Sequence, residues 1–193
     1  MTVTAKTTLH WLGKLPTQRD FVMSADGCLG QQRLLDWCQQ GIAAQGQALL
    51  AHRPQADAPQ DWFFWLRTPQ IPDALLYGMA SSSHDQVGRR HPFLLYREAS
   101  VTMLTAKGLP SLRVRALLTD LVAGTKGLAA LNDVGADSMM MAQLDVPMVS
   151  DLLTPQINAE VSLWVAADER VGTVLAYPMP LDAILYRKLF VQD

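Results

Sequence analysis

The stretch ALLYGMASSSHDQVGRRHPFLLY (residues 74–96) contains two short apolar runs, at 74–80 and 92–96, on either side of a polar segment. A third apolar run, WFFWLR, comes shortly before it at residues 62–67. Short apolar runs bounded by loops favour buried strands over helices. The close spacing of the runs at 62–67 and 74–80 predicts an antiparallel hairpin, because a parallel pair needs a crossover of roughly a dozen or more residues.

Helical patterns lie on both sides of these strands. Apolar residues recur at helical spacing over residues 31–51 and 110–122, SMMMAQL predicts a short helix at 138–144, and a terminal helix is predicted to begin at Pro180. EVSLWVAA (160–167) alternates as a strand does. Strands and helices interleave without regular βαβ alternation, so we expect an α/β fold with a mixed, partly antiparallel central sheet and helices on both faces.

Composition narrows the classes of function. A chain of 193 residues that is 49% hydrophobic can form one sizeable core, and we expect a single domain over residues 1–193. Its formal net charge of -2 lacks the basic excess that nucleic-acid binding requires. No run approaches the roughly 20 apolar residues of a membrane-spanning helix, and the N-terminal residues lack a signal-peptide pattern, which makes a cytoplasmic location the default expectation. Cys28 and Cys38 are expected to be reduced thiols, since their spacing matches no redox or zinc motif.

The polar segment contains the residue types of a catalytic triad, but not their usual arrangement. Ser83, His84 and Asp85 are consecutive, and neighbouring side chains of an extended segment point to opposite faces, which argues against one shared site. A nucleophile elbow is also missing. The four histidines show no metal-ligand spacing, so we expect no metal and no cofactor.

Two other interpretations of the segment remain open. Gly88 allows a close backbone approach, and Arg89 or Arg90 offers a planar fork for a phosphate, although no P-loop accompanies them. Alternatively the segment is a polar turn that precedes a strand, with Asp85 and Arg89 paired across it.

Two motifs together resemble the TagF family of type VI secretion-associated proteins. WLGKLPTQRDFV (11–22) is similar to that family's opening signature, an aromatic residue followed by Gly-Lys-x-Pro and Gly-Asp-Phe, and SSSHDQVGRRHPF (81–93) is similar to its second, Ser-x-Asp-x-Val-Gly-Arg before an aromatic residue and proline. Arg19 replaces the usual glycine and His91 the usual aromatic residue. Trp62 and Trp164 also fall where such proteins have tryptophans. The matching positions are Trp11, Gly13, Lys14, Pro16, Asp20, Phe21, Ser83, Asp85, Val87, Gly88, Arg89 and Pro92.

The resemblance implies a three-layer α/β sandwich and a non-enzymatic, cytoplasmic repressor that acts after translation by binding a forkhead-associated scaffold protein. The matching positions are then candidates for partner binding, and neither a small-molecule substrate nor nucleic acid is expected. The alternative is a phospho-ligand or nucleotide-binding domain, either a binding protein or an enzyme, that uses Lys14, Asp20 and Arg89. A third hypothesis gives both motifs a purely structural role, with Asp20 or Asp85 pairing with Arg89.

Overall fold

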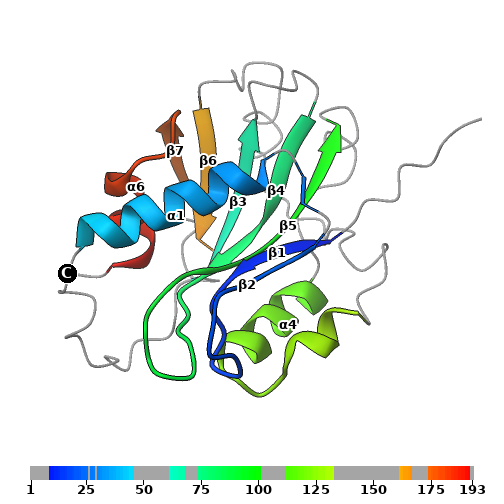
Figure 1. Ribbon diagram of the computed structural model, residues 1–193. Helices are drawn as coiled ribbons and strands as arrows, with labels where there is room; N and C mark the ends of the chain where they lie inside the picture. The colour runs from blue at the N-terminus through cyan, green and yellow to red at the C-terminus, as the bar shows by residue number, and fades with distance from the viewer. Residues whose placement is uncertain are drawn as a thin grey trace, which may run out of the picture.

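The protein is described here by a computed structural model, which places residues 9–25, 27–28, 30–45, 61–67, 74–100, 112–132, 161–166 and 174–191. In these residues seven strands form one sheet in the order β2-β1-β5-β4-β3-β6-β7 (Figure 1). The strands are β1 (His10–Gly13), β2 (Val22–Met23), β3 (Asp61–Arg67), β4 (Ala74–Ser81), β5 (Phe93–Ser100), β6 (Val161–Ala166) and β7 (Val174–Pro178). The helices are α1 (Gln31–Gln45), α4 (Leu112–Val122), α6 (Ala183–Phe190) and the short 3-10 helix η1 (Leu128–Leu131).

Every pair of neighbouring strands is antiparallel, so the prediction of a mixed sheet is wrong in this respect. The predicted hairpin is present, with Phe64 of β3 opposite Gly78 of β4. The interleaved helices do not act as parallel crossovers. Strands from both ends of the chain instead join the edges of the central β3–β4–β5 meander, β1 beside β5 and β6 beside β3.

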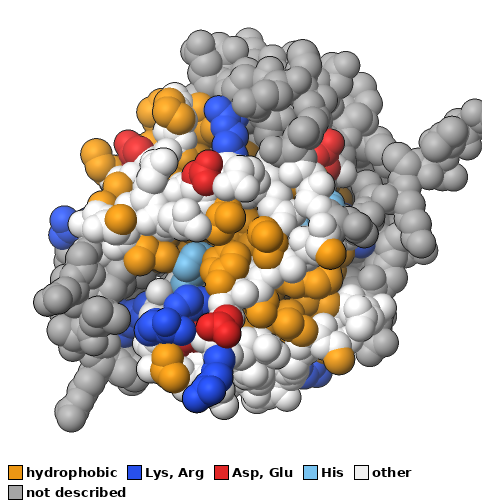
Figure 2. Space-filling view, viewed as in Figure 1, with side chains coloured by type: hydrophobic (Ala, Val, Ile, Leu, Met, Phe, Trp, Pro, Cys, Tyr) orange, Lys and Arg blue, Asp and Glu red, His pale blue; other side chains and the backbone are white. Residues whose placement is uncertain are grey.

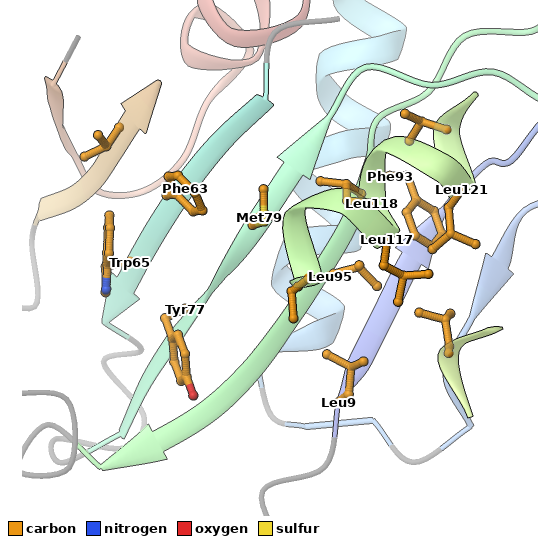
Figure 3. Close-up of a cluster of buried hydrophobic side chains, with 14 of the residues drawn as sticks. Leu9, Phe63, Trp65, Tyr77, Met79, Phe93, Leu95, Leu117, Leu118 and Leu121 are labelled. Carbon is orange, nitrogen blue, oxygen red and sulfur yellow. The ribbon is translucent and has the colours of Figure 1, made fainter. Parts of the chain in front are cut away.

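Alternate side chains of the strands pack on opposite faces of the sheet. On one face Phe63, Trp65 and Met79 pack with the apolar stripe of α4, whose Leu117, Leu118 and Leu121 lie over β5 and β1 (Figure 3). On the other face Phe64 and Trp164 pack with residues of α1 and α6 (Figure 1). The period-two alternation of the strands thus gives each face its own hydrophobic cluster, and the fold is mixed α/β with helices against both faces.

The structure confirms the predicted strands at β3, β4, β5 and β6 and the predicted helices at α1, α4 and α6. Sequence patterns did not indicate β1, β2 or β7. The predicted methionine-rich helix at 138–144 and the end of the helix predicted over 31–51 lie outside the described residues. No helix in the described ranges has both the length and the apolar content needed to cross a membrane.

Candidate functional site

Two loops that are far apart in the sequence meet at one end of the sheet. Residues 14–21 connect β1 to β2, and residues 82–92 connect β4 to β5. Because β1 pairs with β5, with Leu12 opposite Leu94, both loops leave the sheet at the same end. The Gln86 amide donates a hydrogen bond of 2.9 Å to the Gln18 carbonyl oxygen and joins the loops directly. The two motifs identified in the sequence therefore form one structural unit, which we call the loop pair (residues 14–21 and 82–92).

Asp85 is the centre of the loop pair. Its side chain has no exposed surface, and its Oδ2 accepts hydrogen bonds from Lys14 Nζ at 2.8 Å and Arg89 Nε at 2.6 Å. Its Oδ1 accepts from the backbone amides of Val87 at 3.1 Å and Arg89 at 2.8 Å. The carboxylate is thus bound by two cations, one from each loop, and by two backbone donors.

These contacts keep Asp85 ionised. Burial on its own raises the pKa of a carboxyl group, because it penalises the charged form. Here the hydrogen bonds from Lys14 and from the backbone and side chain of Arg89 outweigh burial, and the pKa of Asp85 is held well below its usual range. The site therefore contains a buried negative charge that is compensated within the fold.

The second loop is shaped by a turn around Asp85. The Gly88 amide donates to the Asp85 carbonyl oxygen at 2.9 Å, and the Asp85 amide donates to the Arg89 carbonyl oxygen at 3.0 Å. Gly88 has φ of 86°, a backbone conformation that favours glycine. An aspartate that accepts from the amide two residues onward is typical of such turns. The polar-turn interpretation of this segment therefore describes its geometry.

Gly13 positions the first loop against the second. Its φ is 137°, and a Cβ atom at this position would collide with the carbonyl oxygen of Pro92 and lie 2.7 Å from Phe93 Cα. Glycine is thus required both for the backbone conformation and for the close approach of the two backbone segments. Pro16, farther along the same loop, lies beside Gly124 at the end of α4.

His91 stands at the motif position where the family resemblance leads us to expect an aromatic residue, and its ring packs against another ring. It is buried and meets Phe21 edge to face, with 4.9 Å between ring centroids. Its Nδ1 lies 2.6 Å from the Pro92 carbonyl oxygen, which requires Nδ1 to hold the proton and donate. Burial, with a further contribution from the nearby Lys14 charge, lowers the pKa of His91 to about 4, so the ring is neutral at pH 7.

The remaining predicted residues lie around this centre without joining the ion pairs. Trp11 is partly buried against the α4 side of the sheet, and Ser83 is buried. Val87 is exposed at the turn. Asp20 is exposed and makes no ion pair within the described ranges. Arg89 instead donates from Nη2 to the Arg19 carbonyl oxygen at 3.0 Å, so the hypothesis that Asp20 pairs with Arg89 is wrong.

The consecutive Ser83, His84 and Asp85 do not come together as a triad. Ser83 and Asp85 are buried whereas His84 between them is exposed, as expected for an extended segment. Asp85 is already bound by Lys14 and Arg89. In the part of the chain that the structure describes, no group of three histidine, cysteine, aspartate or glutamate side chains is placed to hold a metal ion.

A cavity of about 290 Å³ lies elsewhere, between α1 and the connection from β7 to α6. Its lining is largely apolar, with a few polar side chains of α1, and includes none of the motif residues. Sequence patterns gave no sign of it, because its walls combine core-facing helix and strand residues with the β7–α6 connection. The residues that line it are Gly30, Arg33, Leu34, Asp36, Trp37, Gln40, Leu66, Leu76, Met179, Pro180 and Leu181.

Comparison with known proteins identifies one family. The profile described as TagF N-terminal domain, type VI secretion system-associated, matches residues 10–121, a range that contains both motifs and runs from β1 almost to the end of α4. No curated protein sequence matches the chain. A solved structure, that of PA0076 from Pseudomonas aeruginosa PAO1, is similar to it with a TM-score of 0.66, 16% sequence identity and coverage of 96% of both chains. At this identity the likeness shows the fold alone.

Proposed function

The chain belongs to the TagF N-terminal domain family and is a type VI secretion-associated protein, and on this premise we propose that it represses type VI secretion after translation. In this proposal it acts without chemistry of its own, in the cytoplasm, by binding a forkhead-associated scaffold protein. We also propose that the whole chain is one domain with the three-layer sandwich architecture of the family, and that the helices on both faces of the sheet form its outer layers.

One observation supports a binding role most directly. The residues of the two family motifs meet in a partly exposed pair of loops, and two cations compensate the buried carboxylate at its centre. Lys14 and Arg89 both bind the carboxylate of Asp85, so a phosphate would have to compete with a buried anion for the same donors. A fixed shape with exposed loop residues is what a protein-binding surface needs.

Secretion of the needle protein tests the repressor role. Deleting the gene in its native host should raise secretion, overexpression should abolish it, and complementation with the wild-type gene should restore the original level. The purified scaffold protein should bind the purified chain. Unchanged secretion in both the deletion and the overexpression strain would refute repression.

The alternative function, binding of a phospho-ligand or nucleotide through Lys14, Asp20 and Arg89, is tested separately. Lys14 and Arg89 bind the same carboxylate, whereas Asp20 makes no ion pair within the described ranges. We expect calorimetry with nucleotides and phosphopeptides at millimolar concentration to give no binding heat. A saturable heat that disappears in Arg89→Ala would favour the alternative over the proposed repressor.

A further inference from the structure

The loop pair has the opposite charge to the chain as a whole. The chain has a formal net charge of -2, whereas the loop pair contains four cations (Lys14, Arg19, Arg89, Arg90) and two carboxylates (Asp20, Asp85). Asp85 is fully buried, and two of the cations compensate it. Figure 2 shows Lys and Arg side chains gathered at the lower left, where the β1–β2 and β4–β5 loops lie in Figure 1. The outward face of the loop pair is therefore positive.

Apolar side chains are exposed beside these charges. The exposed large hydrophobic residues of the described ranges are Val87 at 62%, Ile184 at 61% and Met23 at 50%, and two of these three belong to the loop pair or to β2 that follows it. Phe21 is partly buried against His91. Figure 2 shows a hydrophobic area next to the positive group on the same face. Exposed apolar groups rimmed by polar ones are typical of protein-binding surfaces.

Hydrogen bonds to the buried Asp85 and to the backbone hold the exposed residues of the loop pair in place. Arg89 is half exposed, yet its backbone amide and Nε bind Asp85 and its Nη2 binds the Arg19 carbonyl oxygen. The Val87 amide also donates to Asp85. The network around Asp85 thus holds the outward side chains on an ordered backbone, and a surface that is ordered before binding loses less conformational entropy when a partner binds.

We propose that the outward face of the loop pair, formed by Arg19, Phe21, Gln86, Val87 and Arg89, together with Met23 of the adjoining β2, is the surface that contacts the partner. It takes an acidic protein segment that has an apolar side chain, with the carboxylates meeting Arg19 and Arg89 and the apolar side chain meeting Val87. The inference rests on the proposed function and names the surface through which that function operates.

The chemistry of the surface favours a protein segment over nucleic acid. Tight binding to nucleic acid uses many phosphate contacts from a broad basic surface. Here a few cations share the loops with the exposed carboxylate of Asp20, and Val87 and Met23 would gain nothing from a phosphate backbone. Opposite charge and apolar burial are both satisfied by an acidic segment with an apolar anchor.

Binding of the purified forkhead-associated scaffold to the full chain, measured by calorimetry at low and high salt, tests the assignment. The informative variants are Val87→Asp and Arg19→Ala. Their matched controls are Ile184→Asp, which changes a side chain of nearly equal exposure on α6, and Lys126→Ala, which removes a half-exposed cation after α4. Thermal unfolding of each variant establishes that it is folded before binding is measured.

We expect Val87→Asp to weaken binding by about tenfold or more and Arg19→Ala by about threefold with a flatter salt dependence, whereas both controls stay within about twofold of the wild type. If the scaffold binds and all four variants behave alike, the surface assignment is wrong while the proposed function stands. If the wild-type chain does not bind the scaffold, the proposed function fails and the assignment fails with it. Displacement of the scaffold by a single-stranded oligonucleotide in a manner that requires Arg19 would identify nucleic acid as the ligand class and overturn the proposal.

Discussion

Asp85 and Asp120 are each paired with a lysine at nearly the same distance, 2.8 Å to Lys14 and 2.7 Å to Lys126, but in different surroundings. The Asp85 side chain is fully buried between two loops, whereas that of Asp120 is 38% exposed at the end of α4. Water and salt screen the exposed pair, and such pairs contribute little to stability. The Lys14–Asp85 pair, in which the carboxylate is buried and the lysine is only 16% exposed, is screened much less, so loss of one partner leaves a largely buried charge without its partner. Distance alone does not tell how much an ion pair matters.

Removal of each carboxylate should make this difference measurable. We expect Asp85→Ala to lower the free energy of unfolding by about 3 to 5 kcal/mol, because it leaves Lys14 without its buried partner and two backbone amides without an acceptor. Chemical denaturation measures the change. Asp120→Ala is the matched control and should leave the unfolding curve almost unchanged. Equal losses in the two variants would show that burial does not separate the pairs.

Gly13 at the end of β1 and Gly88 in the loop pair, the two glycines of the motifs, give a second contrast. Gly13→Ala should destabilise by about 3 kcal/mol, since the new Cβ would meet the backbone of Pro92 and Phe93 in addition to the strained φ. Gly88→Ala has a similar constraint on φ but open space around the new Cβ, and about 1 kcal/mol is expected. Thermal melts of both variants rank them. A larger loss of stability in Gly88→Ala than in Gly13→Ala would show that the close contact of Gly13 with Pro92 and Phe93 does not limit the packing of the loops.

The pH dependence of stability should come from the loop pair through His91. An unfolded histidine binds a proton below a pKa of roughly 6.5, but the folded ring resists protonation down to about pH 4. The unfolded state therefore binds more protons between these values, and stability falls as the pH falls, by on the order of 2 to 3 kcal/mol. His91→Phe, with a ring that preserves the contact with Phe21, should flatten this dependence in denaturation series between pH 4 and 7. Parallel curves for variant and wild type would contradict it.

Arg89 should matter less to stability than Asp85 does. The Arg89 side chain is 51% exposed, and Lys14 remains on the carboxylate when Arg89 is removed. We expect about 1 to 2 kcal/mol, measured by denaturant unfolding. The stability of the wild type at acid pH gives a further test. Because the pKa of folded Asp85 is lowered, its contribution to the free energy of unfolding is lost only at pH values below about 4. A loss in Arg89→Ala as large as that in Asp85→Ala would mean that Lys14 contributes nothing.

Sequence patterns predicted the strands whose side chains are buried on both faces of the sheet. Phe63 and Phe64 point to opposite clusters, and runs of this kind are continuous in apolar residues and easy to recognise. The edge strands gave no such signal: β1 is four residues long, β2 is two, and β7 is only partly buried. The strands at 10–13 and 174–178 owe their conformation to pairing with β5 and β6. Their direction follows from those contacts, which explains why we predicted a mixed, partly antiparallel sheet and not one in which every pair of strands is antiparallel.

The candidate site was predicted only in part, because the sequence shows contacts within one turn but not contacts between distant segments. Asp85 and Arg89 are four residues apart in one turn, so their pairing could be proposed from local chemistry. Lys14 is 71 residues away from Asp85, and only the pairing of β1 with β5 brings it to the carboxylate. Likewise, Trp62 and Trp65 are of a residue type enriched at binding surfaces, but only the structure shows that both are buried in the core clusters.

Asp85 joins the two motifs through Lys14, and a double-mutant cycle of Lys14→Met and Asp85→Ala tests this link most directly. The free energies of unfolding of the wild type, both single variants and the double variant give the coupling between the two side chains. A coupling of about 1.5 kcal/mol or more is predicted. Additive effects, within about 0.5 kcal/mol, would show that the pair does not join the loops.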